Sequence, residues 1–222
     1  AFVKVQEGCN NFCSFCKVPY VRGRSQSRDF NLIIEEVKRL SVNGYKEIVL
    51  TGVCLGDYGK DFNERIDLAD LINEIEKIGG ILRVRLSSIE ANDVTKRLIE
   101  KLKVSKKLCP HLHIPFQSGD NEILKLMNKK NTKQKYLELV GKLKSNIKKI
   151  SITTDIMLGF PTEDDAKFKN TLEFLKEVEP EKVHIFTFNP REGTVYSDYK
   201  NKIPQQILEE RLNRIIALRK KL

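Results

Sequence analysis

Hydrophobic residues along this chain follow two patterns that alternate. Apolar or alternating runs of about four to eight residues are each followed by a longer segment with apolar positions at helical spacing. The short runs predict six strands, at residues 2–6, 47–52, 83–88, 111–117, 150–158 and 182–188. The longer segments predict helices at residues 30–40, 64–78, 93–103, 132–145, 164–178 and 205–221.

Strict alternation of strands and helices favours a parallel sheet with right-handed crossovers, either a doubly wound open sheet or a barrel. Six strand–helix units are two fewer than a complete barrel requires. No glycine-rich phosphate-binding turn follows the first strand, which weakens the case for a dinucleotide-binding fold. We therefore predict an α/β fold, a partial (β/α)6 TIM-like barrel, with residues 1–222 forming one domain.

The chain is basic, with 40 lysines and arginines against 30 aspartates and glutamates and a net charge of +10. This balance suits an anionic partner such as nucleic acid, although codon bias toward lysine explains it equally well. No run of about 18 apolar residues is present, so the sequence predicts neither a membrane span nor a membrane partner. Because residue 1 is alanine and the first strand begins at once, we expect the chain to be a piece of a longer protein.

The chain has five cysteines, an odd and clustered set without a secretion signal, which indicates a reducing, cytoplasmic environment. Three of them, Cys9, Cys13 and Cys16, lie in the stretch EGCNNFCSFCKVPY directly after the first predicted strand. A structural zinc ion takes four ligands, usually from separated pairs, whereas these thiols come from one loop. Three thiolates on an iron–sulfur cube leave one iron open to an external ligand, which is a catalytic arrangement. A zinc-stabilised RNA-binding module and a simple electron-transfer protein are the alternatives from other classes.

The spacing Cys9-x3-Cys13-x2-Cys16 after a first strand, with the aromatic Phe15 before the last cysteine, resembles the radical SAM superfamily. This resemblance implies a barrel of the radical SAM type and a [4Fe-4S] cluster whose open iron binds S-adenosylmethionine. It also implies that the three cysteines hold the cluster. Reductive cleavage of S-adenosylmethionine, with electrons from an external donor, would then yield a radical that abstracts hydrogen from the substrate.

Further stretches resemble the methylthiotransferases over essentially the whole chain, namely EIVLTGVCLGDYG, RVRLSSIE, CPHLHIPFQSGDNEILKLMNKK, TTDIMLGFPTE and REGT. Within that family, TGVCLGDYG, SSIE and CPHLHIPFQSG are most similar to the enzymes that methylthiolate C2 of N6-threonylcarbamoyladenosine beside the anticodon of tRNA. The resemblance therefore implies a transferase with tRNA as its partner. Isopentenyladenosine in tRNA and an aspartate of a ribosomal protein are the alternative substrates.

Members of the methylthiotransferase family also carry two flanking domains. One is an N-terminal domain with a second [4Fe-4S] cluster, and the other is a C-terminal RNA-binding β-barrel. We expect both to be absent from residues 1–222.

The resemblance assigns a set of residues near the strand ends to cofactor binding: Phe15, Thr51, Gly52, Ser88, Glu90, Gln117, Ser118, Asp155 and Phe188. Most of these positions also have a structural interpretation. Thr51 and Gly52 suit a turn after a strand, and Ser88 and Glu90 suit the cap of the next helix. Asp155 lies inside a predicted strand, where a carboxylate is costly unless it is paired or lines a site.

Four arginines are candidates for contact with RNA phosphates: Arg22, Arg24 and Arg28 just after the cysteines, and Arg191 after the sixth strand. Salt bridges within the fold are the alternative for the first three. Two further residues depart from the usual pattern of the family. Lys17 follows the third cysteine and is expected to be solvated, and Cys54 follows the second strand and is expected to be a buried apolar thiol.

Overall fold

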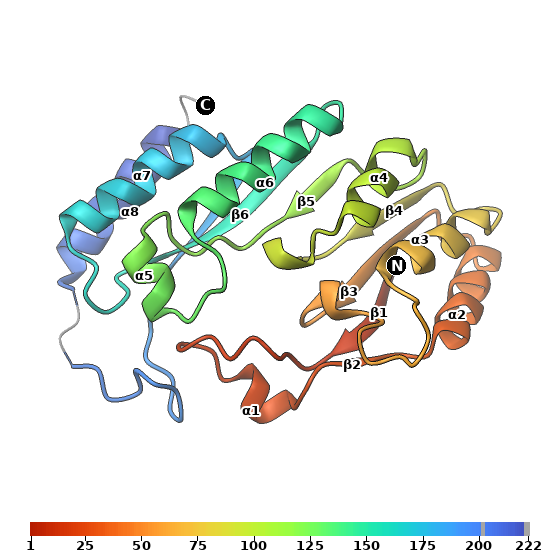
Figure 1. Ribbon diagram of the computed structural model, residues 1–222, viewed down its shortest axis with the longest axis horizontal. Coiled ribbons are helices and arrows are strands. Elements are labelled where there is room, and N and C mark those ends of the chain that lie inside the picture. The colour runs from red at the N-terminus through yellow and green to blue at the C-terminus, as the bar shows by residue number, and fades with distance from the viewer. Residues whose placement is uncertain (201–202, 220–222) are drawn as a thin grey trace. The chain divides into compact units, whose positions relative to one another are not determined.

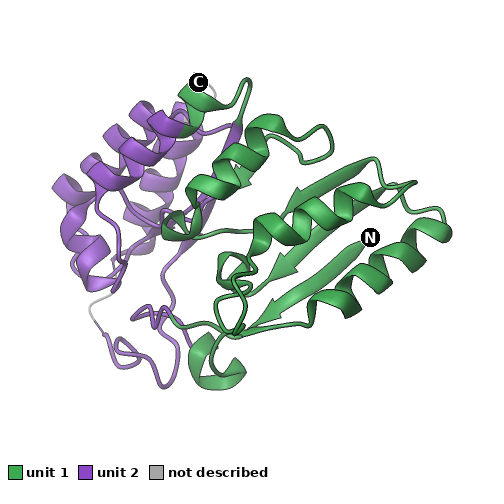
Figure 2. Ribbon diagram, turned by 45° about the vertical axis from the view of Figure 1, so that its right-hand side comes forward, with its two compact units in different colours: residues 1–10, 18–113, 143–150 green, residues 11–17, 114–142, 151–222 purple. Residues whose placement is uncertain are grey.

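The computed structural model describes residues 1–200 and 203–219 of the chain (Figure 1). Strands and helices alternate along it, as the hydrophobic pattern predicts. The chain divides into two compact units, which Figure 2 colours separately. Unit 1 comprises residues 1–10, 18–113 and 143–150, and unit 2 comprises residues 11–17, 114–142 and 151–222. Each unit is therefore assembled from segments that are separated in the sequence.

Unit 1 is built on parallel strands, whose arrows share one direction in Figure 2. The strands of this unit are β1 (Phe2–Glu7), β3 (Glu47–Gly52), β4 (Arg83–Leu86) and β5 (His111–His113), with a short β2 (Gln26–Ser27) antiparallel to β1. β3 lies between β1 and β4, with Phe2 opposite Val49 and Glu47 opposite Arg83. Ser88, which follows β4, pairs with His113 at the end of β5 in an isolated parallel bridge.

The helices of unit 1 are α1 (Val18–Arg22), α2 (Phe30–Val42), α3 (Leu68–Lys77) and α4 (Lys96–Val104), with single turns η1 (Leu55–Asp57) and η2 (Ala91–Asp93). Side-chain caps set where the longer ones begin. Asp29 accepts a hydrogen bond from the Leu32 N–H at the start of α2, and Asp67 forms a capping box with Asp70 at the start of α3. Helix α3 therefore begins later than the predicted start at residue 64.

The two faces of the unit 1 sheet differ in polarity, because side chains alternate along each strand. The buried positions of its strands include Val3, Val5, Ile48, Leu50, Val84 and Leu86. The alternate positions carry polar residues such as Lys4, Thr51 and Arg85, which are half-buried or exposed.

Unit 2 contains two longer parallel strands and the helices around them. Its elements are α5 (Asn121–Leu126), α6 (Lys133–Asn146, ending in unit 1), β6 (Ser151–Leu158), α7 (Asp165–Val178), β7 (Lys182–Thr187) and α8 (Gln205–Arg219). β6 pairs with β7 from Thr153 opposite Lys182, and α8 contacts both strands and α7. Ile156, Phe168 and Ile215 lie in one buried cluster that joins these elements.

All six predicted strands and all six predicted long helices are present, and the differences lie in short elements. The strand predicted at 111–117 ends at His113, and Gln117, the last predicted residue, adopts a left-handed backbone conformation with φ of 70°. The strand predicted at 83–88 ends at Leu86. Helices α1 and α5 and strand β2 were not predicted, since such short segments hold too few residues to show a period.

The ends of the chain add two further observations. The last two residues of the helix predicted at 205–221 lie outside the described residues. Among the described residues, no helix combines the length and apolar character needed to cross a membrane.

Candidate functional site

The loop between β1 and α1 carries Cys9, Cys13 and Cys16, which are half-buried and form no disulfide in the described part of the chain. Gly8 opens this loop with φ of 70°, and a Cβ placed there would lie 2.0 Å from the carbonyl oxygen of Arg24. The Cys9 N–H donates to the carbonyl oxygen of Gly23 at 3.2 Å. Only glycine accommodates both the left-handed conformation and the close backbone approach, so Gly8 positions the first cysteine.

Substituting Gly8 with alanine is expected to destabilise unit 1 by about 1–3 kcal/mol, because the new Cβ strains the backbone and meets the Arg24 carbonyl. Chemical denaturation measures this loss of unfolding free energy. Gly141→Ala is the matched control, since Gly141 lies inside α6 and a Cβ there would meet nothing within 4 Å. That change should be neutral or stabilise by up to about 1 kcal/mol. Wild-type stability of Gly8→Ala would contradict this loop geometry.

The second part of the cysteine loop is anchored on the end of α5 in unit 2. Ser14 donates from its N–H to the Met127 carbonyl at 3.1 Å and from its hydroxyl to the Leu126 carbonyl at 2.7 Å. Asn128 donates from Nδ2 to the Phe12 carbonyl at 2.9 Å. The last carbonyls of a helix lack partners within the helix, so α5 supplies acceptors that hold the segment with Cys13 and Cys16.

Two residues that the sequence assigned to the cofactor, Phe15 and Phe188, lie in one aromatic cluster of unit 2. The fully buried ring of Phe160 lies 6.3 Å from Phe15, 5.3 Å from Phe188 and 5.1 Å from Tyr196, measured between ring centroids. All three pairs have edge-on geometry, which aromatic rings favour. This cluster is compatible with two roles for Phe15 and Phe188. The rings could simply fill space in the fold, or they could form the predicted wall against an adenine ring.

Gln117 and Ser118, also assigned to the cofactor, have different surroundings. The Gln117 N–H donates to the Asp155 carbonyl at 2.9 Å, and the Gln117 carbonyl accepts from the Met157 N–H at 2.9 Å. Within the described part of the chain, the buried Gln117 Oε1 has no hydrogen-bond partner. Ser118 instead bonds to the Thr171 hydroxyl at 3.2 Å and is 2% exposed. Gln117 is thus the better candidate for a ligand contact, since a buried unpaired oxygen is costly without one.

The end of β3 forms part of a small cavity in unit 1. Its volume is about 270 Å³, and it is lined by Lys4, Gln6, Glu7, Val18, Arg22, Thr51, Gly52 and Val53. A Cβ on Gly52 would lie 2.9 Å from Gln6 Oε1, so glycine is needed there for packing alone. Thr51 donates its hydroxyl to the Val3 carbonyl at 3.3 Å. The cavity brings the predicted pair Thr51 and Gly52 together with Arg22, a predicted RNA contact.

The remaining cofactor candidates lie near the ends of other strands. Ser88 is exposed, and Glu90 is the N-cap residue of η2 without a capping side-chain bond. The neighbouring Ser87 hydroxyl is buried and, within the described residues, has no hydrogen-bond partner. Asp155 is half-buried in β6, directly opposite His184 of β7. Asp155 also lies beside Gln117 in unit 2, since its carbonyl accepts the Gln117 N–H.

The four predicted RNA-contact arginines separate into two groups. Arg28 forms an ion pair with Glu36 and donates to the Lys4 carbonyl at 3.3 Å, which agrees with the salt-bridge alternative. Arg22 is 60% exposed and reaches Glu7 at 3.4 Å. Arg24 and Arg191 are exposed, Arg191 within a turn that the Thr194 hydroxyl stabilises. Arg22, Arg24 and Arg191 therefore remain the accessible cations of the predicted four.

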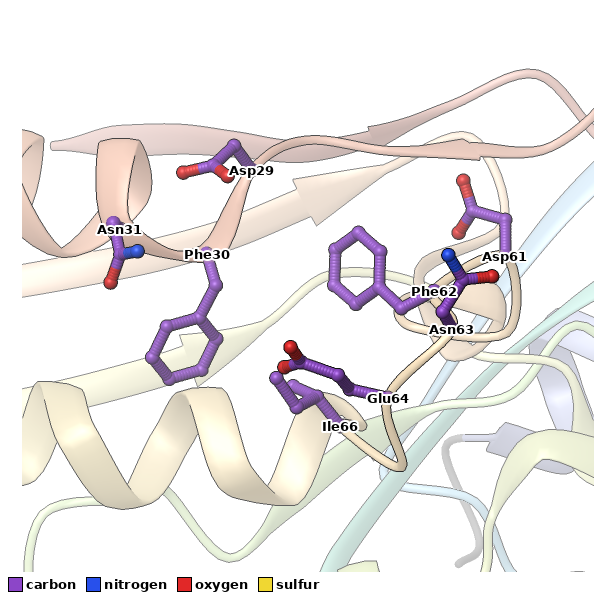
Figure 3. Close-up of a pocket in the computed structure, with 8 residues that line it drawn as sticks. All are labelled: Asp29, Phe30, Asn31, Asp61, Phe62, Asn63, Glu64 and Ile66. Atoms are coloured by element: carbon purple, nitrogen blue, oxygen red, sulfur yellow. The ribbon is translucent and has the colours of Figure 1, made fainter.

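A larger cavity in unit 1, of about 470 Å³, is acidic (Figure 3). Phe62 and Glu64 project from the loop before α3 toward Phe30 at the start of α2. Asp29 and Asp61, which also line it, accept hydrogen bonds from the backbone N–H groups of Leu32 and Ser27. Carboxylates repel phosphate, so this cavity is unsuited to RNA.

Parallel strands with intervening helices, and a loop with three cysteines after the first strand, define an α/β protein equipped to hold an iron–sulfur cluster. The chain belongs to the Radical SAM superfamily, whose family model matches residues 3–175. Membership implies a [4Fe-4S] cluster and S-adenosylmethionine as cofactors. The donor set fits such a cluster, because three cysteine sulfurs in one loop, none of them in a disulfide among the described residues, are the soft ligands that it takes.

Curated relatives match nearly the whole chain. The tRNA-2-methylthio-N(6)-dimethylallyladenosine synthase of Acetivibrio thermocellus is 44% identical over 216 residues, which cover 97% of this chain and 45% of that protein. The synthase of the same name from Pelotomaculum thermopropionicum is 40% identical over 222 residues, covering 100% of this chain and 50% of that protein. The chain thus spans about half the length of these relatives.

Solved structures share the fold at low sequence identity. The radical S-adenosylmethionine methyltransferase TsrM from Kitasatospora setae has a TM-score of 0.72 at 14% identity, covering 88% of this chain and 38% of that one. Methylornithine synthase has a TM-score of 0.66 at 17% identity, covering 98% of this chain and 62% of that one. The predicted α/β fold of the partial-barrel, radical SAM type is confirmed.

Proposed function

We propose that this chain is the catalytic domain of a tRNA methylthiotransferase that adds a methylthio group to N6-dimethylallyladenosine, also called isopentenyladenosine. The observation that carries the proposal is its identity of 40–44%, over nearly its whole length, to synthases named for that product. These names favour the isopentenyladenosine alternative over threonylcarbamoyladenosine, the substrate that the sequence motifs indicated. The matched relatives are about twice as long as this chain, so the complete activity belongs to a longer protein.

In this proposal, Cys9, Cys13 and Cys16 hold the [4Fe-4S] cluster. When bound, the cluster supplies the electron for the reductive cleavage of S-adenosylmethionine. Gln117 Oε1 offers an unused acceptor to a hydroxyl or ammonium group, and Phe15 and Phe188 offer aromatic walls. Thr51 and Gly52 form a strand end without a bulky side chain, which leaves the cavity beside Arg22 open to a small polar group.

The exposed arginines would contact the RNA backbone. The guanidinium groups of Arg22, Arg24 and Arg191 can each bind two phosphate oxygens at once. The net charge of +10 also attracts RNA to the chain. We infer that the rest of the longer protein supplies the second cluster and the RNA-binding β-barrel of the methylthiotransferases. An external electron donor completes the set of partners.

Mass spectrometry of tRNA nucleosides from a strain lacking the complete gene tests this function. We expect 2-methylthio-N6-isopentenyladenosine to disappear and its precursor without the methylthio group to accumulate. The complete gene should restore the product, and the gene carrying Cys13→Ala should not. If the methylthiolated threonylcarbamoyladenosine disappears instead, the substrate is threonylcarbamoyladenosine, as the sequence motifs indicated. Unchanged tRNA with an altered ribosomal protein would contradict a tRNA substrate.

A further inference from the structure

Gln6, near the carboxyl end of β1, is buried beside the candidate site, with 1% of its surface exposed. It follows an irregularity in the pairing of β1 with β3, which places Lys4 opposite Thr51 but Gln6 opposite Gly52. Such an extra residue in one strand changes the direction of the side chains that follow it. Gln6 lines the same small cavity as Thr51 and Gly52. The irregularity thus brings the Gln6 side chain to the end of β3.

The carboxamide of Gln6 joins three segments of unit 1. Its Oε1 accepts a hydrogen bond from the Cys54 N–H, just after β3, at 2.8 Å. Its Nε2 donates to the carbonyl oxygens of Glu7 at 2.6 Å and Gly8 at 2.9 Å, where the cysteine loop begins, and to the Ser25 hydroxyl at 2.9 Å. Both ends of the carboxamide are therefore engaged within the protein, so Gln6 is suited to hold segments together rather than to contact a ligand.

A second set of contacts holds the segment around Cys54. Cys54 is buried as predicted, with 4% of its surface exposed, but the surroundings of its sulfur are polar rather than apolar, since Sγ lies 3.7 Å from Asp93 Oδ2. The Lys60 ammonium donates to Asp93 Oδ1 and to Asp57 Oδ1, both at 2.6 Å. These ion pairs join η1 to η2. Gln6 then connects this pair of turns to the start of the cysteine loop.

We propose that Gln6 is a positioning residue for S-adenosylmethionine, whose carboxamide fixes the end of β3 relative to the first cysteine of the loop. The proposal rests on the proposed function, in which Cys9 holds the cluster and Thr51 and Gly52 lie where the cosubstrate binds. A cosubstrate that contacts both the cluster and a strand end needs the two in a fixed arrangement. The cluster itself needs only the three sulfurs of the loop. Loss of the Gln6 carboxamide should therefore weaken cosubstrate binding more than cluster binding.

The test uses the chain reconstituted anaerobically with iron and sulfide, and S-adenosylmethionine as the probe. Equilibrium dialysis with the cluster oxidised measures its Kd without cleavage. Gln6→Met keeps the length of the side chain and removes its donor and acceptor. We expect it to bind as much iron and sulfide as wild type but to raise the Kd by about 10–100-fold, the usual cost of losing a residue that orients a ligand group. Under reducing conditions, the loss should appear mainly in the KM for S-adenosylmethionine rather than in kcat.

Hydrogen exchange of the chain without the cluster tests the geometric cause directly. The Cys54 N–H bonds to Gln6 Oε1, so this amide should exchange faster in Gln6→Met than in wild type. Ser105→Ala is the matched control, because the Ser105 hydroxyl accepts two backbone hydrogen bonds after α4, elsewhere in unit 1. This control should lose stability but keep the wild-type Kd and the wild-type exchange of the Cys54 amide.

Three outcomes would overturn the proposal, and they are distinguishable. A cluster-loaded Gln6→Met with the wild-type Kd would overturn the role of Gln6 alone. An equal rise of the Kd in Ser105→Ala would assign the effect to general loss of stability. A wild-type chain that holds no cluster would overturn the proposed function and this role together. Should Gln6→Met not fold, Gln6→Asn keeps a carboxamide that is one methylene too short to join Cys54 to Gly8, and its Kd must likewise rise.

Discussion

Cys13→Ala is expected to lose the iron–sulfur cluster and to reduce cleavage of S-adenosylmethionine to background. Wild type should bind about four iron and four sulfide ions per chain after anaerobic reconstitution. Removal of one of three thiolates leaves two protein ligands in a loop that α5 holds in place through Ser14, and the loop contains no fourth cysteine to take over the position. Iron and sulfide analysis measures the first effect, and formation of 5′-deoxyadenosine measures the second.

Cys109→Ala is the control for this experiment, because Cys109 lies near β5, away from the cysteine loop in the sequence. Burial raises the pKa of its thiol, which disfavours the thiolate that a metal requires. This variant should keep the full iron content. Full iron content in Cys13→Ala would contradict the assignment of the cluster, and a colourless wild-type protein containing zinc would support the binding-module alternative.

Arg211→Met is expected to destabilise unit 2 by about 3–5 kcal/mol, because it leaves the carboxylate of Glu163 buried without a counter-charge. Arg211 Nη1 lies 2.6 Å from Glu163 Oε1, and the two side chains are 4% and 3% exposed. The guanidinium also reaches Asp165 at 2.8 Å and lies 5.1 Å from the ring centroid of Phe168. Denaturant unfolding of the variant and of wild type measures the loss.

Two comparisons separate this effect from general damage to the core. The double variant Glu163→Met with Arg211→Met should recover much of the loss, because no charge then remains buried. Lys169→Ala, which removes an exposed partner 4.0 Å from Glu173, should cost less than about 1 kcal/mol. A double variant no more stable than Arg211→Met would contradict the proposed cause.

The same ion pair predicts a pH dependence. Burial raises the pKa of Glu163 from 4.5 to about 7, against the opposing effects of the Gly159 N–H and Arg211. Because the folded pKa lies above the unfolded value, the contribution of Glu163 to stability is complete below about pH 4.5 and declines as the pH rises toward 7. Glu163→Gln should remove this decline. Denaturation at pH 5 and pH 7.5 compares the two proteins, and an unchanged slope in Glu163→Gln would contradict the raised pKa.

Glu163 also has a partner that its sequence position does not predict. It follows the fifth predicted strand in the sequence, and the structure places its carboxylate in a buried ion pair with Arg211, 48 residues away. Ser118 and Arg28 show the same effect, since internal partners occupy both side chains. The type of a residue and its place in the strand–helix order predict the element on which it lies. They do not predict the partners of its side chain, because those partners come from distant segments.

The α/β class, the long strands and helices, and the three-cysteine motif follow from the amino-acid sequence alone, because periodicity and spacing are local properties of the chain. The three-dimensional structure was needed to establish the short elements α1, β2 and α5, the left-handed turn at Gln117, and the polar surroundings of Cys54. Each of these depends on hydrogen bonds or packing between segments far apart in the sequence. Such contacts override local preference, since their free energy exceeds the small differences between local conformations.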